Sequence, residues 1–195
     1  MLTAYPPKSS RGLTLIELLI VLILSASIVA IAAPAMGQWV RDIEVRSSAS
    51  SLLATLQAAR AEAVTRNASV RLQLTDAQGR PGWQLGCTQS TGRCPTLIRQ
   101  QATDLGTSVR WGIALLTAMP SIDSVITAGS GMPAGIRFDA TGAAADIATG
   151  ADIARIDITY RTEPSTRRRV ILVSAQGMAR MCDPSASASH PTSCD

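Results

Sequence analysis

The chain has 195 residues, 46% hydrophobic and only 3% aromatic, with a formal net charge of +4. This length suits one folded domain with an additional segment, and the charge is too small for a global basic field, so nucleic-acid binding would need a local patch. No phosphate-binding glycine motif occurs, and the one histidine, His190, lies in a Ser/Pro-rich tail. The sequence therefore indicates no enzyme, no metal site and no cofactor site.

A short polar segment, residues 1–12, precedes an almost wholly apolar one, residues 13–33. About 20 apolar residues, at 1.5 Å of helical rise each, can cross the roughly 30 Å hydrocarbon core of a bilayer. Lys8 and Arg11 stand before this run, which favours a cytoplasmic N-terminus and places the rest of the chain outside the inner membrane. Glu17 is the one residue of the run that can carry a charge, and a carboxylate in hydrocarbon costs several kcal/mol.

Residues 11–21, RGLTLIELLIV, resemble the processing signal of type IV prepilins and pseudopilins. The resemblance implies that residues 1–12 are a leader peptide, that a prepilin peptidase cuts between Gly12 and Leu13, and that the new amine of Leu13 is methylated. Leu13 stands where this family usually has Phe. Removing Lys8 and Arg11 from 18 basic side chains leaves 16 against 14 acidic ones, a net charge of +2. A generic signal anchor is the alternative, and it explains neither Gly12 nor Glu17.

Glu17 is predicted to act in assembly. Cleavage would create an α-amine on Leu13, four residues or about 6 Å along the helix from Glu17. Either charge alone would be costly in an apolar bundle, and pairing them within or between subunits removes most of that cost. The pair would then set the register of one subunit against the next. In the alternative interpretation, the Glu17 carboxylate reaches the membrane surface and has no partner.

The helix is expected to continue through residues 34–66, with a kink at Pro34 because proline removes one backbone hydrogen bond. Beyond Trp39 apolar residues recur at spacings of three and four, which predicts one buried stripe on an amphipathic helix. Asn67 is the predicted stop. The stripe comprises Ala49, Leu52, Leu53, Leu56, Ala59 and Ala63.

The junction at residues 58–67, followed by the alternating residues 70–74, is similar to the GspH/FimT group of minor pilins and pseudopilins, as is the F-x-x-x-G element from Phe138 to Gly142. This resemblance implies an α+β, type IV pilin-like fold, in which a long kinked N-terminal helix packs on an antiparallel β-rich domain, residues 67–182. Residues 113–132 show no clear pattern. Strands are expected at residues 70–75, 83–87, 96–100, 108–112, 153–160, 168–174 and 178–182, with a further strand entering a turn within 135–142.

Four cysteines behind an export signal indicate two disulfides in an oxidising compartment. The sequence-local pairs Cys87–Cys94 and Cys182–Cys194 are favoured, although four cysteines allow three connectivities. Residues 183–195 are rich in Ser, Ala and Pro and are predicted to form a flexible tail.

The last predicted hairpin is rich in arginine and resembles that of FimT-like minor pilins, where a G-R-x-R motif is implicated in DNA binding. Gly177 and Arg180 match the ends of that motif, but Met178 stands at its first Arg. Loss of one guanidinium removes a phosphate contact, and nearby arginines could compensate. The alternative is a solvated hairpin face. The candidate DNA-binding residues are Arg167, Arg168, Arg169 and Arg180.

The resemblance implies a structural role, as a minor subunit placed near the tip of a type IV pilus that initiates or supports its assembly. Expected partners are other pilins, the prepilin peptidase and the inner membrane, with DNA as a further candidate. The chain would first cross the inner membrane once, with its domain in the periplasm, and then enter the filament. The alternatives are a minor pseudopilin of a type II secretion system, a DNA-binding minor pilin for uptake and a monomeric anchored periplasmic domain.

Overall fold

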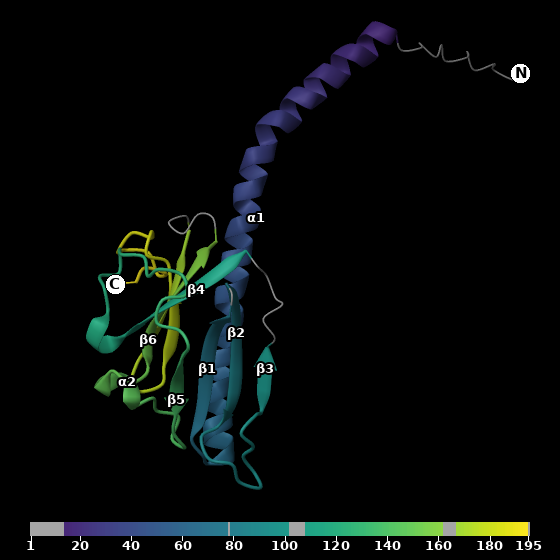
Figure 1. The fold of residues 1–195 in the computed structure, drawn as a ribbon. Helices are drawn as coiled ribbons and strands as arrows, with labels where there is room; N and C mark the ends of the chain where they lie inside the picture. Colours follow the sequence, from purple (N-terminus) through teal and green to yellow (C-terminus); the bar gives the residue numbers. More distant parts are fainter. Residues whose placement is uncertain (1–13, 78, 102–107, 162–166, 195) are drawn as a thin grey trace, which may run out of the picture. The chain divides into compact units, whose positions relative to one another are not determined.

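The computed structural model describes residues 14–77, 79–101, 108–161 and 167–194. It divides into two compact units, Met1–Val40 and Arg41–Asp195. We call them the helical unit and the domain, and each is considered by itself. One helix, α1 (Leu15–Arg66), contributes to both units (Figure 1).

Helix α1 has 52 residues and ends where the sequence predicts. Asn67 follows it with a φ of 50°, the left-handed conformation that commonly terminates helices. The Asn67 amide donates to the Val64 carbonyl at 3.1 Å, and the Ala68 amide donates to the Ala63 carbonyl at 3.1 Å. These two bonds form a Schellman motif, which satisfies carbonyls that a helix end would otherwise leave unpaired.

The part of α1 within the domain buries one stripe of apolar side chains. Ala59 and Ala63 are small enough to let the neighbouring sheets approach the helix closely. Leu53, expected in the same stripe, is only partly buried. The buried members are Val45, Ala49, Leu52, Leu56, Ala59 and Ala63.

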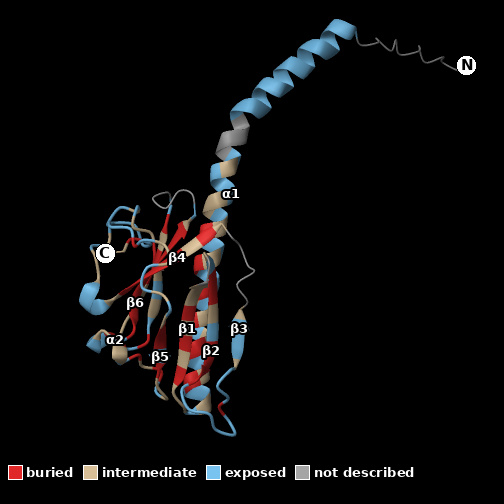
Figure 2. Ribbon diagram, in the orientation of Figure 1, coloured by how far each residue is buried: buried red, intermediate tan, exposed pale blue. Residues whose placement is uncertain are grey.

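The described residues of the domain also form two four-stranded antiparallel sheets, which confirms the predicted α+β fold (Figure 1). The first sheet has the order β3-β2-β1-β5 and the second has the order β4-β6-β7-β8. In Figure 2 the buried segments of the strands belong to both sheets, so the core lies among the two sheets and the helix. The first sheet contains β1 (Val70–Ala77), β2 (Arg80–Cys87), β3 (Arg99–Gln101) and β5 (Ala134–Phe138). The second contains β4 (Val109–Leu115), β6 (Ile153–Tyr160), β7 (Arg169–Val173) and β8 (Ala179–Cys182).

The region without a clear sequence pattern contains the end of β4, a short 3₁₀ helix, η1 (Leu116–Ala118), and turns. The register of β4 against β6 shifts between Ala114 and Leu115, a bulge that a single-strand pattern does not reveal. Neither η1 nor the short helix α2 (Asp146–Thr149) was predicted. Strand β3 is shorter than the predicted 96–100 segment and begins later.

Two glycine turns meet beside helix α1. Gly142 and Gly177 both have positive φ angles, 81° and 76°. A Cβ atom on Gly177 would lie 2.0 Å from the Gly142 carbonyl oxygen, so only hydrogen fits there. The same carbonyl accepts a hydrogen bond from Arg60 Nε at 3.0 Å. This contact joins the turn between β7 and β8 to the turn after β5 and to the helix.

We predict that Gly177→Ala lowers the free energy of unfolding by about 2 kcal/mol or more, because it adds left-handed strain to a steric clash. The matched control is Gly92→Ala, since a Cβ at Gly92 meets no atom within 4 Å. Urea unfolding of the detergent-solubilised chain, followed by near-ultraviolet circular dichroism, measures both variants. Equal stability of the two variants would contradict the proposed contact.

Candidate functional site

The N-terminus of α1 is closed by a reciprocal pair of side chains. The Thr14 amide and the Thr14 hydroxyl both donate to Glu17 Oε2 at 2.9 Å, and the Glu17 amide donates to Thr14 Oγ1 at 3.3 Å. This arrangement is a capping box, with Thr14 as the N-cap and Glu17 three residues later. The Thr-x-x-Glu spacing was a signal in the sequence for this role of Thr14, which the sequence analysis missed. The Glu17 carboxylate is consequently held against Thr14.

The helical unit presents apolar side chains around its whole circumference. Among the described residues one helix, α1, is long and apolar enough to cross a membrane, with a mean hydropathy of 2.8 in its most apolar window, near the N-terminus. That window has no buried residues. A helix that is apolar all round requires a bilayer or a protein bundle around it. Ser25 and Ser27 do not disturb this surface, because their hydroxyls donate to the carbonyls of Val21 and Ile23.

Two predicted features of this segment stay predictions. The cleavage site at Gly12 and Leu13, and the leader before it, lie outside the described residues. Helix α1 continues through Pro34 without interruption, and the kink predicted there remains untested.

The burial of Arg168 corrects the predicted DNA-binding surface, in which Arg168 was a candidate. It is only 6% exposed, and its Nη1 donates to Asp157 Oδ2 at 2.8 Å and to the Ser124 carbonyl at 2.8 Å. Asp157 also accepts two hydrogen bonds from buried Arg155, from Nε at 2.7 Å and from Nη2 at 2.9 Å, and a third from the Ile126 amide at 3.1 Å. Arg168 is therefore a core residue of the domain and cannot reach a DNA phosphate.

The two buried arginines also bind the loop between η1 and β5. Arg155 donates to the carbonyls of Pro120, Ser121, Ile122 and Ser124, and Arg168 donates to the Ile122 carbonyl. One carboxylate cannot accept all the hydrogen bonds that two guanidinium groups donate, and the loop carbonyls accept others. Buried charged groups require such hydrogen-bond partners. The loop path therefore depends on the Arg155–Asp157–Arg168 cluster.

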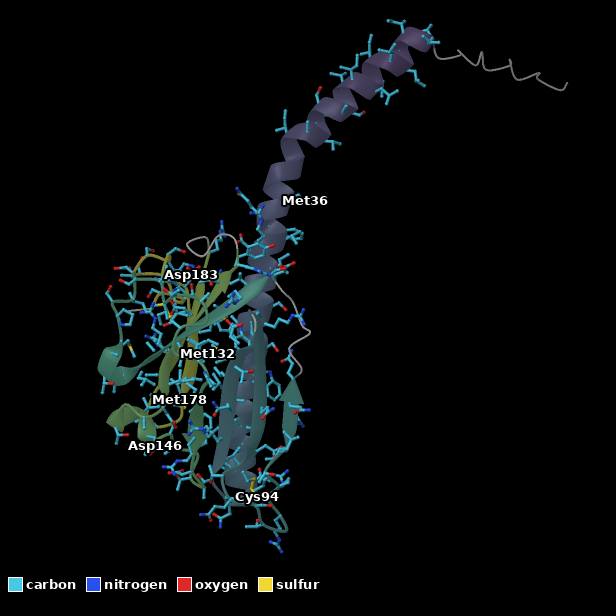
Figure 3. All side chains as sticks on the ribbon, viewed as in Figure 1. Met36, Cys94, Met132, Asp146, Met178 and Asp183 are labelled. Atoms are coloured by element: carbon cyan, nitrogen blue, oxygen red, sulfur yellow. A yellow bond between two sulfur atoms is a disulfide. The ribbon has the colours of Figure 1, made fainter. Side chains whose placement is uncertain are left out.

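The other three candidate arginines are less buried. Arg167 is exposed and its Nε lies 3.2 Å from Asp42 Oδ2. Arg169 is partly buried, and its Nη1 lies 2.7 Å from Asp183 Oδ2. Arg180 is exposed and donates from Nη2 to the Cys194 carbonyl at 3.0 Å. Met178, at the position of the missing arginine, is 59% exposed, and its sulfur accepts from Arg60 Nη1 at 3.2 Å (Figure 3).

Both predicted sequence-local disulfides are present, Cys87–Cys94 and Cys182–Cys194. Figure 3 shows Cys94 and Asp183, the neighbour of Cys182, at opposite ends of the domain. The disulfides therefore close loops at two separate places, and no cysteine of the described chain is free.

The tail predicted for residues 183–195 contains turns that the sequence did not predict, and its flexibility stays a prediction. Residues 183–194 form turns held by the Cys182–Cys194 disulfide and by the Asp183 amide, which donates to the Thr192 carbonyl at 2.7 Å. Partial burial alone would raise the pKa of Asp183, but hydrogen bonds from Ser185 and the charge of Arg169 outweigh it and hold that pKa below its usual value. Ser-rich composition does not encode these tertiary contacts.

No group of three or more His, Cys, Asp or Glu side chains in the part of the chain that the structure describes is arranged to hold a metal ion. His190 is exposed, and its Nδ1 lies 2.8 Å from Thr192 Oγ1.

Comparison with known proteins gives two family-model matches. The model for the type II transport protein GspH matches residues 48–177, and the model for the prokaryotic N-terminal methylation motif matches residues 7–33. The first match lies within the domain, and the second covers the end of the predicted leader, from residue 7, and the whole apolar run. No match was found among curated proteins.

Two solved structures illustrate the similarity. The type IV minor pilin FimU of Pseudomonas aeruginosa PAO1 is 19% identical, with a TM-score of 0.46 over 78% of this chain and 96% of FimU. The minor pseudopilin EpsH from the type 2 secretion system of Vibrio cholerae is 12% identical, with a TM-score of 0.48 over 73% of this chain and 99% of EpsH.

We predict that Arg168→Ala lowers the free energy of unfolding by about 3 kcal/mol, because it removes a partner of buried Asp157 and leaves loop carbonyls without a donor. Arg93→Ala, at an exposed position, should change it by less than about 0.5 kcal/mol. Chemical unfolding of the full chain in detergent compares the two. A similar small effect of both substitutions would show that Arg168 is a surface residue.

Proposed function

The chain belongs to the family of the type II transport protein GspH and carries a prokaryotic N-terminal methylation motif, and from this premise we propose that it is a minor pilin of a type IV pilus. In this proposal a prepilin peptidase cuts between Gly12 and Leu13, Leu13 is methylated, and the subunit enters the filament near its tip, where it initiates or supports assembly. Its partners are other pilins. Before assembly the chain crosses the inner membrane once, with the domain in the periplasm.

One observation carries the proposal, namely the apolar helical unit whose only described charge, Glu17, contacts Thr14 at the first turn of the helix. A bilayer can accept the apolar surface but gives the carboxylate no cation. Cleavage before Leu13 would create an α-amine one residue before Thr14, whose amide already contacts Glu17 Oε2. An ammonium and a carboxylate brought together in an apolar bundle neutralise each other, which supports a role for Glu17 in packing against other subunits.

A pseudopilin of a type II secretion system is the second candidate, and the family name favours it. The chemistry of the helix is the same in both machines, because both need a processed apolar helix. A deletion strain separates them: a type IV pilus subunit is needed for surface filaments, and a secretion pseudopilin is needed for release of exported enzymes from the periplasm.

We predict that Glu17→Gln lowers the amount of the subunit in sheared filaments by at least about tenfold, while the protein still inserts in the membrane. Glutamine can replace glutamate in a capping box, so this change keeps the helix cap and removes only the charge. An uncompensated ammonium in the bundle would cost several kcal/mol, and 1.4 kcal/mol already corresponds to tenfold. Immunoblots of sheared and membrane fractions, normalised to the major subunit, provide the measurement.

The matched control is Thr14→Val, which removes the hydroxyl side of the cap and leaves the carboxylate. It should enter filaments at close to the unmodified level. If Glu17→Gln assembles normally and Thr14→Val does not, then Glu17 acts through the helix cap and the charge-pairing role is wrong.

A further inference from the structure

A groove of about 440 Å³ opens on the domain between helix α1 and the turn that joins β7 to β8. The residues that line it are Gln57, Arg60, Ala61, Val64, Thr65, Gly177, Met178 and Ala179. None of these described lining residues carries a carboxylate. Val64 and Met178 are large apolar side chains that are 51% and 59% exposed. Exposed apolar side chains that gather beside a groove indicate a surface that binds a partner.

Arg60 supplies the positive charge of this groove. Its Nε donates to the Gly142 carbonyl at 3.0 Å, and its Nη1 donates to the Met178 sulfur at 3.2 Å. Both acceptors are uncharged, and Arg60 forms no ion pair with a described carboxylate. A guanidinium has five N–H donors, and Arg60 is only partly buried. Donors therefore remain for a carboxylate that approaches from outside the molecule.

A second surface of the same domain, the loop at residues 121–125, has the complementary chemistry. Asp123 is exposed, and it makes no ion pair or side-chain hydrogen bond with a described residue. Val125, two residues later, is 39% exposed, and both side chains line one hollow of about 240 Å³. Arg167 also lines this hollow, but its Nε is paired with Asp42 Oδ2 at 3.2 Å. The loop therefore presents an unpaired carboxylate beside an apolar side chain.

The groove and the hollow lie at opposite ends of strand β7. Arg168, which lines the hollow, precedes the strand, and Gly177, which lines the groove, follows it. Five residues at about 3.3 Å each separate these ends by roughly 17 Å. Figure 3 likewise shows Met178 apart from Asp183, the neighbour of Pro184 in the hollow. One molecule cannot bring the two surfaces together, so a contact between them requires two molecules.

We propose that the groove of one copy of the chain binds the 121–125 loop of a second copy. The Asp123 carboxylate would accept hydrogen bonds from Arg60, and Val125 would pack on Met178. The contact joins two different surfaces, so a pair of copies still has one groove and one loop available for further copies. The loop loses little freedom on binding, because the buried arginine cluster already fixes its path. The inference goes beyond the proposed function, since it requires only a second copy and no filament.

Photocrosslinking of the purified full chain in detergent tests this inference. A photoreactive amino acid replaces Thr65, an exposed residue of the groove, and the peptides of crosslinked dimers are identified by mass spectrometry. The expected product joins position 65 to a peptide that contains residues 121–125. Asp123→Arg and Arg60→Glu should each lower the yield of this product by at least about tenfold, because each places like charges opposite one another. Arg93→Glu makes the same change of charge at an exposed position of another loop and should leave the yield unchanged.

Mixing the two charge-reversed variants provides the second arm. The carboxylate introduced at position 60 then faces the guanidinium introduced at position 123, so the mixture should regain crosslinked dimers but no longer chains. Because Arg60 also holds the Gly142 carbonyl, Met178→Glu serves as a second groove variant. Its new carboxylate would pair with Arg60 within the molecule and should lower the yield as well.

Three results would overturn the inference: a yield insensitive to these substitutions, a mixture that gives no dimers, or a product without residues 121–125. All variants keep the same helical unit, so association of the apolar helices in the micelle cannot cause the differences between them. The proposed function stands under any of these results, because none of them concerns processing or entry into a filament.

Discussion

The rest of the structure depends on one helix that requires two different environments. Within the domain, α1 buries a single stripe ending in Ala59 and Ala63, and the sheets pack on that stripe. Within the helical unit the same helix is apolar on all sides, and its most apolar window has no buried residue among the described ones. Burial of apolar surface contributes roughly 25 cal/mol per Å². The first environment is satisfied by folding, and the second can be satisfied only by lipid or by other protein chains.

The charged groups of the domain and of the helical unit are satisfied in different ways. In the domain, Asp157 accepts hydrogen bonds from two arginines and a backbone amide. Its carboxylate is therefore satisfied within the chain and needs no other subunit. In the helical unit, Glu17 accepts hydrogen bonds only from Thr14 among the described residues. Glu17 is the group for which we propose a partner in a filament.

The sequence predicted the elements whose signals are local. The end of α1 at Asn67 and the span of β6 follow from helix-stop chemistry and strand composition. It could not separate Arg168 from Arg167 and Arg169, because three adjacent arginines look alike until a fold brings Asp157 beside one of them. The turns of the tail could not be predicted for the same reason, since their contacts involve Arg169 and Cys182, which belong to other elements.

The central claim is that the apolar helix is made for assembly after processing and that its membrane state is temporary. Intact-mass and N-terminal peptide mass spectrometry of the protein purified from its own cells tests this most directly. The account predicts a chain that begins at Leu13 with a methylated α-amine. A chain that retains Met1 and the residues up to Gly12 would contradict it, because Glu17 would then have no new ammonium to pair with.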